Sequence, residues 1–205
     1  IEVDHSKFAG SVKRTPGLVR ILTAKDVPSN GFGIYPHIKD QPVLADGVTR
    51  FRGEAVLSLV GTRAAVEAFD ESTLPIEYTI LSPVMGLDAS MAPGATQVLP
   101  DRPGNLLQDG GVVKGDADAA FEACAAIAEG EFETAFVEHA YIEPEAGWAR
   151  RVRRAGEDRL EIHVTTQTPY MDRDEMAVVM KLKPSQIRIV PTACGGGFGG
   201  KLDMS

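Results

Sequence analysis

The chain has 205 residues, of which 43% are hydrophobic and 24% charged, and this composition is ordinary for a globular protein with a substantial core. Its formal net charge of -8 argues against a nucleic-acid binder, because such proteins carry a basic face. No apolar run approaches the ~20 residues of a membrane span, and two cysteines, Cys124 and Cys194, indicate a reducing, cytoplasmic location.

Residues 1–82 predict a compact unit that contains both strands and a helix. Strands are expected at 17–22, 55–60 and 76–80, with a helix at 63–69. The run 55–60 is continuously apolar, which is typical of a strand buried on both faces.

Proline and glycine break every periodic pattern in residues 83–108, which indicates a linker. A second unit is expected at 109–205, and its helix at 116–125 is predicted to be capped by Asp116. Its other expected elements are strands at 127–136, 160–164 and 187–190, a helix at 172–182, and a hairpin or loop carrying the solvated arginine cluster 150–154.

The last of these strands runs into Cys-Gly-Gly-Gly-Phe-Gly-Gly-Lys at 194–201. Five of the six positions 195–200 are glycine, and so much backbone freedom needs a physical reason. The usual reason is close approach to the main chain, often by a phosphate or a pyrophosphate-bearing cofactor.

Two nucleotide-binding motifs partly match this glycine loop. A dinucleotide fold would need an acidic residue about 20 positions after the motif, and the sequence given stops sooner. A P-loop would need Ser or Thr after Lys201 to bind Mg²⁺, and that position is Leu202. A P-loop nucleotide binder remains a disfavoured alternative.

Other motifs accompany the loop along nearly the whole chain. They are Thr-Gln at 166–167, Glu-His-Ala-Tyr-Ile-Glu-Pro-Glu at 138–145, Thr-Ala-Lys-Asp-Val-Pro at 23–28, Leu-Ala at 44–45 and Arg-Gly-Glu-Ala-Val at 52–56. Taken together, in their order along the chain, they resemble the xanthine dehydrogenase/aldehyde oxidase family, specifically the N-terminal part of its molybdenum-cofactor-binding subunit. The resemblance implies an α+β chain: a hammerhead domain at 1–82, a linker at 83–108, and the first part of a mixed α/β molybdopterin-binding domain, truncated, at 109–205.

The resemblance also implies which residues meet the cofactor. Gln167 matches a glutamine whose amide donates a hydrogen bond to an oxo ligand of molybdenum, a role for which an uncharged NH₂ group is suited. Gly196, Gly197, Phe198 and Gly199 match the loop whose main chain lies against the metal centre, which the pterin dithiolene holds without a side-chain ligand. The ring of Phe198 is expected in the substrate pocket, or alternatively as an anchor of the loop.

His139 lies in the 138–145 motif, which we interpret as a buried polar network that fixes a strand and not as a catalytic site. Leu202 joins Phe198 in the expected substrate pocket. Purine-hydroxylating relatives often carry Glu at that position, so Leu202 argues against xanthine itself.

The implied activity is hydroxylation of an aldehyde or N-heterocycle with water as the oxygen donor. The general-base glutamate of the family is expected beyond Ser205, and neither Glu143 nor Glu145 matches its position. No catalytic residue is therefore expected in this chain, which alone is expected to be inactive as a fragment or split subunit.

The implied cofactor is molybdopterin, with its cytosine dinucleotide form as an alternative. The implied partners are the remaining molybdopterin-binding segments, together with iron–sulfur clusters and FAD on other domains or subunits of an oligomeric enzyme. A second hypothesis is a non-catalytic fragment that keeps the fold and serves in assembly or partner binding.

Overall fold

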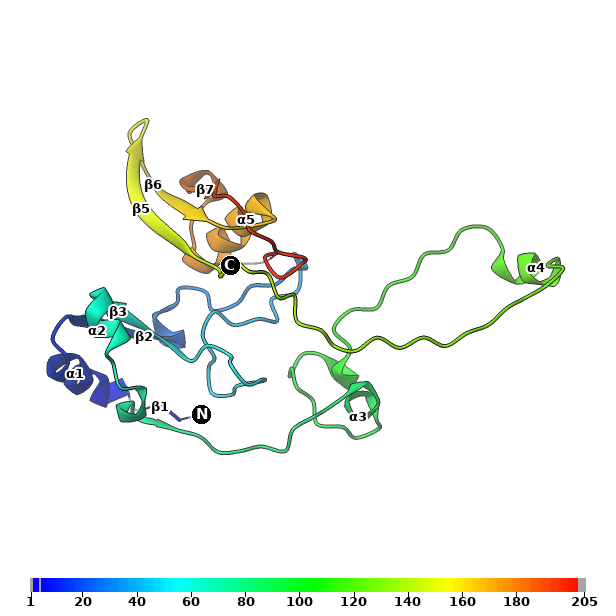
Figure 1. Ribbon diagram of the computed structural model, residues 1–205, viewed down its shortest axis with the longest axis horizontal. Coiled ribbons are helices and arrows are strands. Elements are labelled where there is room, and N and C mark those ends of the chain that lie inside the picture. Colours follow the sequence, from blue (N-terminus) through cyan, green and yellow to red (C-terminus); the bar gives the residue numbers. More distant parts are fainter. Residues whose placement is uncertain (1, 4, 203–205) are drawn as a thin grey trace. The chain divides into compact units, whose positions relative to one another are not determined.

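The structure is a computed structural model that describes residues 2–3 and 5–202, and it divides into two units (Figure 1). The first unit combines residues 1–81 with 139–205, and the second comprises residues 82–138. Helices and strands both occur, as expected for the predicted α+β class. No helix within the described part of the chain is long and apolar enough to cross a membrane.

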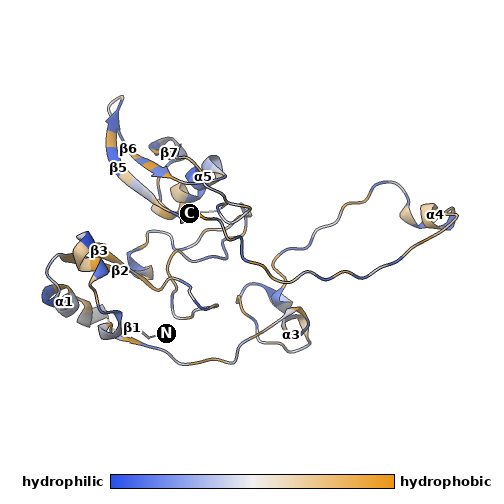
Figure 2. Cartoon of the chain, in the orientation of Figure 1, coloured by the Kyte–Doolittle hydropathy of each residue, from blue (hydrophilic) through white to orange (hydrophobic). Residues whose placement is uncertain are grey.

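The N-terminal part of the first unit is built on a two-stranded antiparallel pair, β2 with β3. Its elements are β1 (Glu2–Val3), α1 (His5–Arg14), β2 (Leu18–Thr23), β3 (Leu57–Gly61), α2 (Arg63–Glu67) and β4 (Ile76–Glu77), which pairs with β1. Phe8, Leu18 and Ile21 form its buried core, and Leu57 and Leu59 pack against them. The apolar character of β2 and β3 is visible in Figure 2.

The strands expected at 17–22 and 55–60 and the helix expected at 63–69 are thus confirmed as β2, β3 and α2. The expectation that 55–60 is buried on both faces is wrong. In β3 only Leu57 and Leu59 are half-buried, because a two-stranded sheet has one covered face. The strand expected at 76–80 is only Ile76–Glu77. Helix α1 was not predicted, and Gly10 within it weakens the helical signal.

The second unit contains two short helices, α3 (Leu87–Met91) and α4 (Ala117–Glu122). The predicted cap of α4 is confirmed, since the Asp116 side chain accepts a hydrogen bond from the Ala119 N–H at 3.0 Å. The strand expected at 127–136 is wrong. Within the described residues this segment pairs with no other strand, and Phe132 is 93% exposed.

The C-terminal part of the first unit is a three-stranded sheet with the order β5-β6-β7. The antiparallel hairpin of β5 (Gly147–Arg154) and β6 (Glu157–Val164) carries the arginine cluster, as predicted, and α5 (Pro169–Met180) crosses over to the parallel β7 (Ile187–Pro191). The helix expected at 172–182 begins three residues earlier, because Pro169 occupies its first turn, where proline is favoured.

One carboxylate links all three strands of this sheet. Glu161 of β6 accepts hydrogen bonds from Arg150 Nη2 of β5 at 2.6 Å and from Arg188 Nη1 of β7 at 3.1 Å. The Nε2 atom of His163, whose ring stacks on Trp148 at 3.9 Å, lies 3.0 Å from the same carboxylate. The hydrogen bonds of His163 and Arg150, with the charges of Arg150 and Arg188, lower the pKa of Glu161 to about 2.

The parallel register of β6 and β7 places their carboxyl ends at one edge of the sheet, where Val164 pairs with Pro191. Gln167 follows β6 and the glycine loop follows β7, so both lie at this edge. In α/β sheets, ligands bind outside the carboxyl ends of parallel strands. The topology therefore brings together the two features that the sequence singled out.

The core of the N-terminal part supplies a direct test of this fold. Ile21 is 6% exposed and Val19 of the same strand is 70% exposed. We expect Ile21→Ala to lower the free energy of unfolding by about 2–5 kcal/mol, because it leaves a cavity between α1 and β3. The matched control Val19→Ala is expected to cost at most about 1 kcal/mol. Equal losses in urea denaturation would contradict this assignment of the buried face.

Candidate functional site

The glycine loop folds back as a tight turn beyond β7. The Thr192 N–H donates to the Val164 carbonyl at 3.0 Å, which extends the pairing of β6 and β7 by one residue. The Gly200 N–H then donates to the Gly197 carbonyl at 2.8 Å and closes the turn. Phe198 lies inside it with a φ of 52°, a left-handed conformation that is uncommon for an aromatic residue.

Gln167 is bound to this loop by both its backbone and its side chain. Its N–H donates to the Lys201 carbonyl at 3.0 Å. Its Oε1 accepts hydrogen bonds from the N–H groups of Gly199 at 3.0 Å and Lys201 at 3.2 Å. Only the amide oxygen can accept from two N–H donors, so the contacts define which branch is Oε1 and which is Nε2. The NH₂ branch therefore points away from these loop amides and remains available as an uncharged donor.

Three of the loop glycines have a steric explanation within the chain itself. A Cβ atom on Gly195 would lie 2.7 Å from Glu143 Cβ. A Cβ atom on Gly197 would lie 2.3 Å from Gln167 Oε1, and one on Gly200 would lie 2.7 Å from the ring atom Cε1 of Tyr141. These are distances that real Cβ atoms essentially never show. The glycines let the loop pack directly onto Gln167 and Tyr141.

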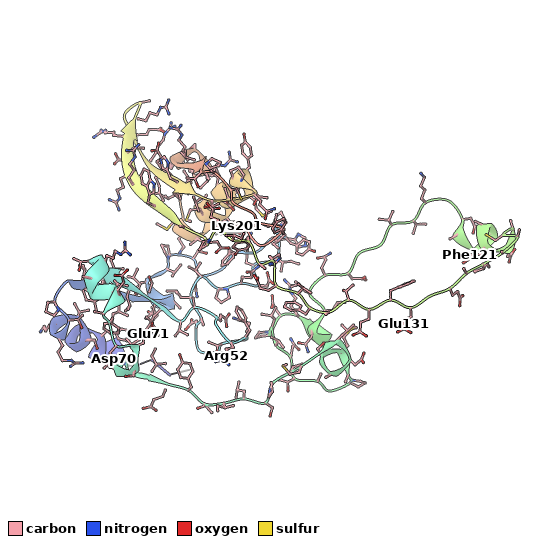
Figure 3. All side chains as sticks on the ribbon, in the orientation of Figure 1. Arg52, Asp70, Glu71, Phe121, Glu131 and Lys201 are labelled. Atoms are coloured by element: carbon pink, nitrogen blue, oxygen red, sulfur yellow. The ribbon has the colours of Figure 1, made fainter. Side chains whose placement is uncertain are left out.

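The loop is also tied to the segment 139–145, which precedes β5. Glu143 Oε2 accepts from the Gly195 N–H at 2.6 Å and from Lys201 Nζ at 3.1 Å. Lys201, labelled in Figure 3, is 0% exposed, and its Nζ also donates to the Glu143 carbonyl at 3.0 Å and lies 4.5 Å from the centre of the Tyr141 ring. The hydrogen bond from Gly195 and then that from Lys201 lower the pKa of Glu143 from its ordinary value of 4.5.

The remaining residues expected in the site lie on or beside the loop. Phe198 is 76% exposed, so its ring does not anchor the loop in the core. Leu202 is half-buried, and its carbonyl accepts a hydrogen bond from the Thr168 hydroxyl. His139 is exposed, and its imidazole would lie 3.7 Å from a Cβ atom on Gly199.

The interpretation of 138–145 as a buried network that fixes a strand is wrong. The segment is irregular in the structure, and it packs beneath the glycine loop through Tyr141 and Glu143. No local pattern in the sequence assigned a role to Glu143, Tyr141 or Lys201. The signal that could have found the pair of Glu143 and Lys201 is a lysine directly after a glycine loop together with a glutamate inside the 138–145 motif.

The arrangement of these groups limits what the site can do chemically. The Lys201 ammonium is buried against Glu143 and cannot reach a phosphate outside the loop, which argues against a P-loop. Within the described residues, no group of three or more His, Cys, Asp or Glu side chains could hold a metal ion. What the edge offers is the Gln167 NH₂ donor, loop backbone and an exposed aromatic ring, groups that bind and orient and do not transfer protons.

A family model and several known proteins match this chain. The model of the family described as "Molybdopterin cofactor-binding domain" matches residues 98–205. The chain is similar to the nicotinate dehydrogenase large molybdopterin subunit of Eubacterium barkeri, with 34% identity over 100% of this chain and 46% of that subunit. The chain therefore spans less than half the length of that relative.

Two solved structures share the fold. The aldehyde oxidoreductase of Desulfovibrio gigas matches with a TM-score of 0.76 and 24% identity, over 95% of this chain and 22% of that one. The quinoline 2-oxidoreductase of Pseudomonas putida 86 matches with a TM-score of 0.72 and 26% identity, over 94% of this chain and 25% of that one.

The contacts of Glu143 predict how it titrates. Its pKa in the folded chain is lowered, so its contribution to stability is fully present above pH 4.5 and is lost as the pH falls through the folded-state pKa. Side-chain carboxyl titration by NMR is expected to give a midpoint below 4.5 for Glu143, and Lys201→Met is expected to raise it. A wild-type midpoint at or above 4.5 would show that the contacts with Gly195 and Lys201 are absent in solution.

Proposed function

This chain belongs to the molybdopterin cofactor-binding domain family, whose model matches residues 98–205, and we propose that it forms one side of the molybdenum–pterin site of an oxidoreductase. The observation that carries the proposal is the position of Gln167. Its side chain is held by two loop amides so that an uncharged NH₂ donor is available at the carboxyl edge of β6 and β7.

The residues at this edge fit such a group. An oxo or pterin ligand needs a hydrogen-bond donor and close approach to the main chain. The Gln167 NH₂ group is such a donor, and the glycines of the turn carry no side chains that would hold a ligand away. The Glu143 carboxylate beside the loop accepts from Gly195 and is paired with the Lys201 ammonium, which balances its negative charge.

We assign the roles as follows. Gln167 donates a hydrogen bond to the cofactor, and the turn of Gly196, Gly197, Phe198 and Gly199 lies against it. When bound, the molybdenum–pterin group supplies the two-electron oxidation that hydroxylates the substrate carbon, with water as the oxygen donor. The general base is a glutamate of the full-length protein that does not belong to this chain.

The substrate in this proposal is an aldehyde or an N-heterocycle. The ring of Phe198 and the side chain of Leu202 line the approach to the cofactor, and both are apolar. The similar proteins include a nicotinate dehydrogenase, a quinoline oxidoreductase and an aldehyde oxidoreductase, which supports this class. A hydrocarbon at position 202 cannot hydrogen-bond a purine, so xanthine itself is disfavoured.

We further propose that this chain works inside a larger assembly in the cytoplasm. The second unit exposes large apolar side chains, and Figure 3 labels Phe121 among those drawn on it. These include Val112, Val113, Phe132, Phe136 and Val137. Apolar surface of this extent marks an interaction site, which we assign to the remaining molybdopterin-binding segments.

We also propose how the chain is divided into domains, which form of the cofactor it binds and where the electrons go. The domains are a hammerhead at 1–82, a linker at 83–108 and the first part of the molybdopterin-binding domain at 109–205. The cofactor is molybdopterin or its cytosine dinucleotide form, and iron–sulfur clusters and FAD on partner domains or subunits accept the electrons.

Substitution of Gln167 tests the proposed function. In the full-length protein purified with its partners, Gln167→Ala is expected to lower kcat by about 10²–10³-fold, because a preorganised donor to the reacting group is lost. The matched control is Gln186→Ala, which removes the same amide before β7, at the opposite edge of the sheet. Its kcat is expected to stay within about twofold of wild type, because the Gln186 side chain contacts the Lys183 N–H before β7 and not the glycine loop.

Unchanged hydroxylase activity in Gln167→Ala would count against this site and favour the non-catalytic assembly module. Equal losses in Gln167→Ala and Gln186→Ala would show that the effect arises from folding and not from the donor.

A further inference from the structure

The two ends of the glycine loop meet at a single carboxylate. Gly195 begins the loop and Lys201 ends it, and Glu143 Oε2 lies 2.6 Å from the N–H of the first and 3.1 Å from the Nζ of the second. One oxygen atom thus closes a ring of seven residues. The loop is thus bound to the segment 139–145, which precedes β5 in the chain.

Lys201 is an unusual residue to find without solvent contact. Lysine is almost never fully buried unless it is paired, because removing an ammonium from water is costly. Here the Nζ has three partners: the Glu143 carboxylate, the Glu143 carbonyl at 3.0 Å and the face of the Tyr141 ring at 4.5 Å. All three partners belong to the segment 141–143, so they hold the ammonium beside that segment. The backbone of Lys201 is thereby kept near it as well.

The backbone of Lys201 is in turn bound to Gln167. Its N–H donates to Gln167 Oε1 at 3.2 Å, and its carbonyl accepts from the Gln167 N–H at 3.0 Å. A displacement of Lys201 would therefore break one backbone and one side-chain contact of Gln167 and leave its amide oxygen held by the Gly199 N–H alone. Lys201 therefore connects the ion pair with Glu143 to the NH₂ group of Gln167.

We propose that Glu143 and Lys201 are positioning residues of this site, because their ion pair closes the glycine loop and thereby sets the direction in which Gln167 presents its NH₂ group. This inference rests on the proposed function, and it assigns the two residues no contact with cofactor or substrate. It explains why a lysine follows the glycines when its ammonium faces inward.

Hydrogen–deuterium exchange measures closure of the loop independently of activity. In the full-length protein, Glu143→Ala is expected to speed exchange of the amides in residues 195–201 by about tenfold or more, because the Gly195 N–H loses a charged acceptor. The matched control Glu157→Ala removes an exposed carboxylate 3.5 Å from Arg159 Nη2 at the tip of the hairpin, and it is expected to leave this exchange unchanged.

Steady-state kinetics then separate positioning from general destabilisation. Glu143→Ala is expected to lower kcat by about 10- to 100-fold, because the donor is misaligned, and to change KM by less than about threefold. Glu143→Gln is expected to recover part of kcat and of the exchange protection, since its amide oxygen can still accept from Gly195 and Lys201 but no longer carries the charge that balances the buried ammonium. A loss of kcat in Glu143→Gln as large as that in Glu143→Ala would overturn the role of the acceptor.

A double-mutant cycle with Lys201→Met tests whether the two residues act through one contact. The double variant is expected to exchange no faster than the more strongly affected single variant, because each substitution breaks the same ion pair. Additive effects, or unchanged exchange of 195–201 in Glu143→Ala, would overturn the inference. If Glu143→Ala does not fold, Glu143→Gln and Lys201→Met complete the same cycle.

The two proposals fail in different measurements. Unchanged exchange of residues 195–201 in Glu143→Ala overturns this inference alone, whereas unchanged kcat in Gln167→Ala overturns the proposed function.

Discussion

The ion pair between the Glu143 carboxylate and the buried Lys201 ammonium is the interaction on which the candidate site depends. An unpaired ammonium could not remain at this depth, so the position of the glycine loop is coupled to the segment that carries Glu143. The same carboxylate binds the start of the loop at the Gly195 N–H. Through the backbone of Lys201 the constraint reaches Gln167, whose NH₂ group is the feature that points to cofactor binding.

The sheet supplies the platform for this arrangement. A parallel pair of strands, joined by the crossover helix α5, places the residues after β6 beside those after β7. Glu161 links β5, β6 and β7 on the face where Arg150 and Arg188 lie, and it holds the register that brings Val164 opposite Pro191. A shift of one residue would separate Gln167 from the loop amides. The contacts between Gln167 and the glycine loop thus depend on the register of β6 and β7.

Local patterns in the sequence predicted the elements whose signal is local. The strand before the glycine loop, the Asp116 cap and the arginine hairpin were recognised because propensity and turn chemistry suffice for them. The strand expected at 127–136 failed because a strand needs a hydrogen-bonding partner, and the described residues provide none. The contact of Glu143 with Lys201 joins residues 58 positions apart, and no periodicity encodes such a pair. The resemblance to a known family pointed to Gln167. The direction of its amide follows only from the fold, in which the oxygen accepts from the loop and the NH₂ group is left to donate.

We propose that this chain contributes one side of a molybdenum–pterin site. Elemental and fluorescence analysis of the full-length protein purified with its partners measures both components of that site. We expect molybdenum and a pterin to be present together in proportion to the chain and to be lost together when the protein is denatured and desalted. A correctly assembled preparation that contains neither molybdenum nor pterin would contradict this proposal.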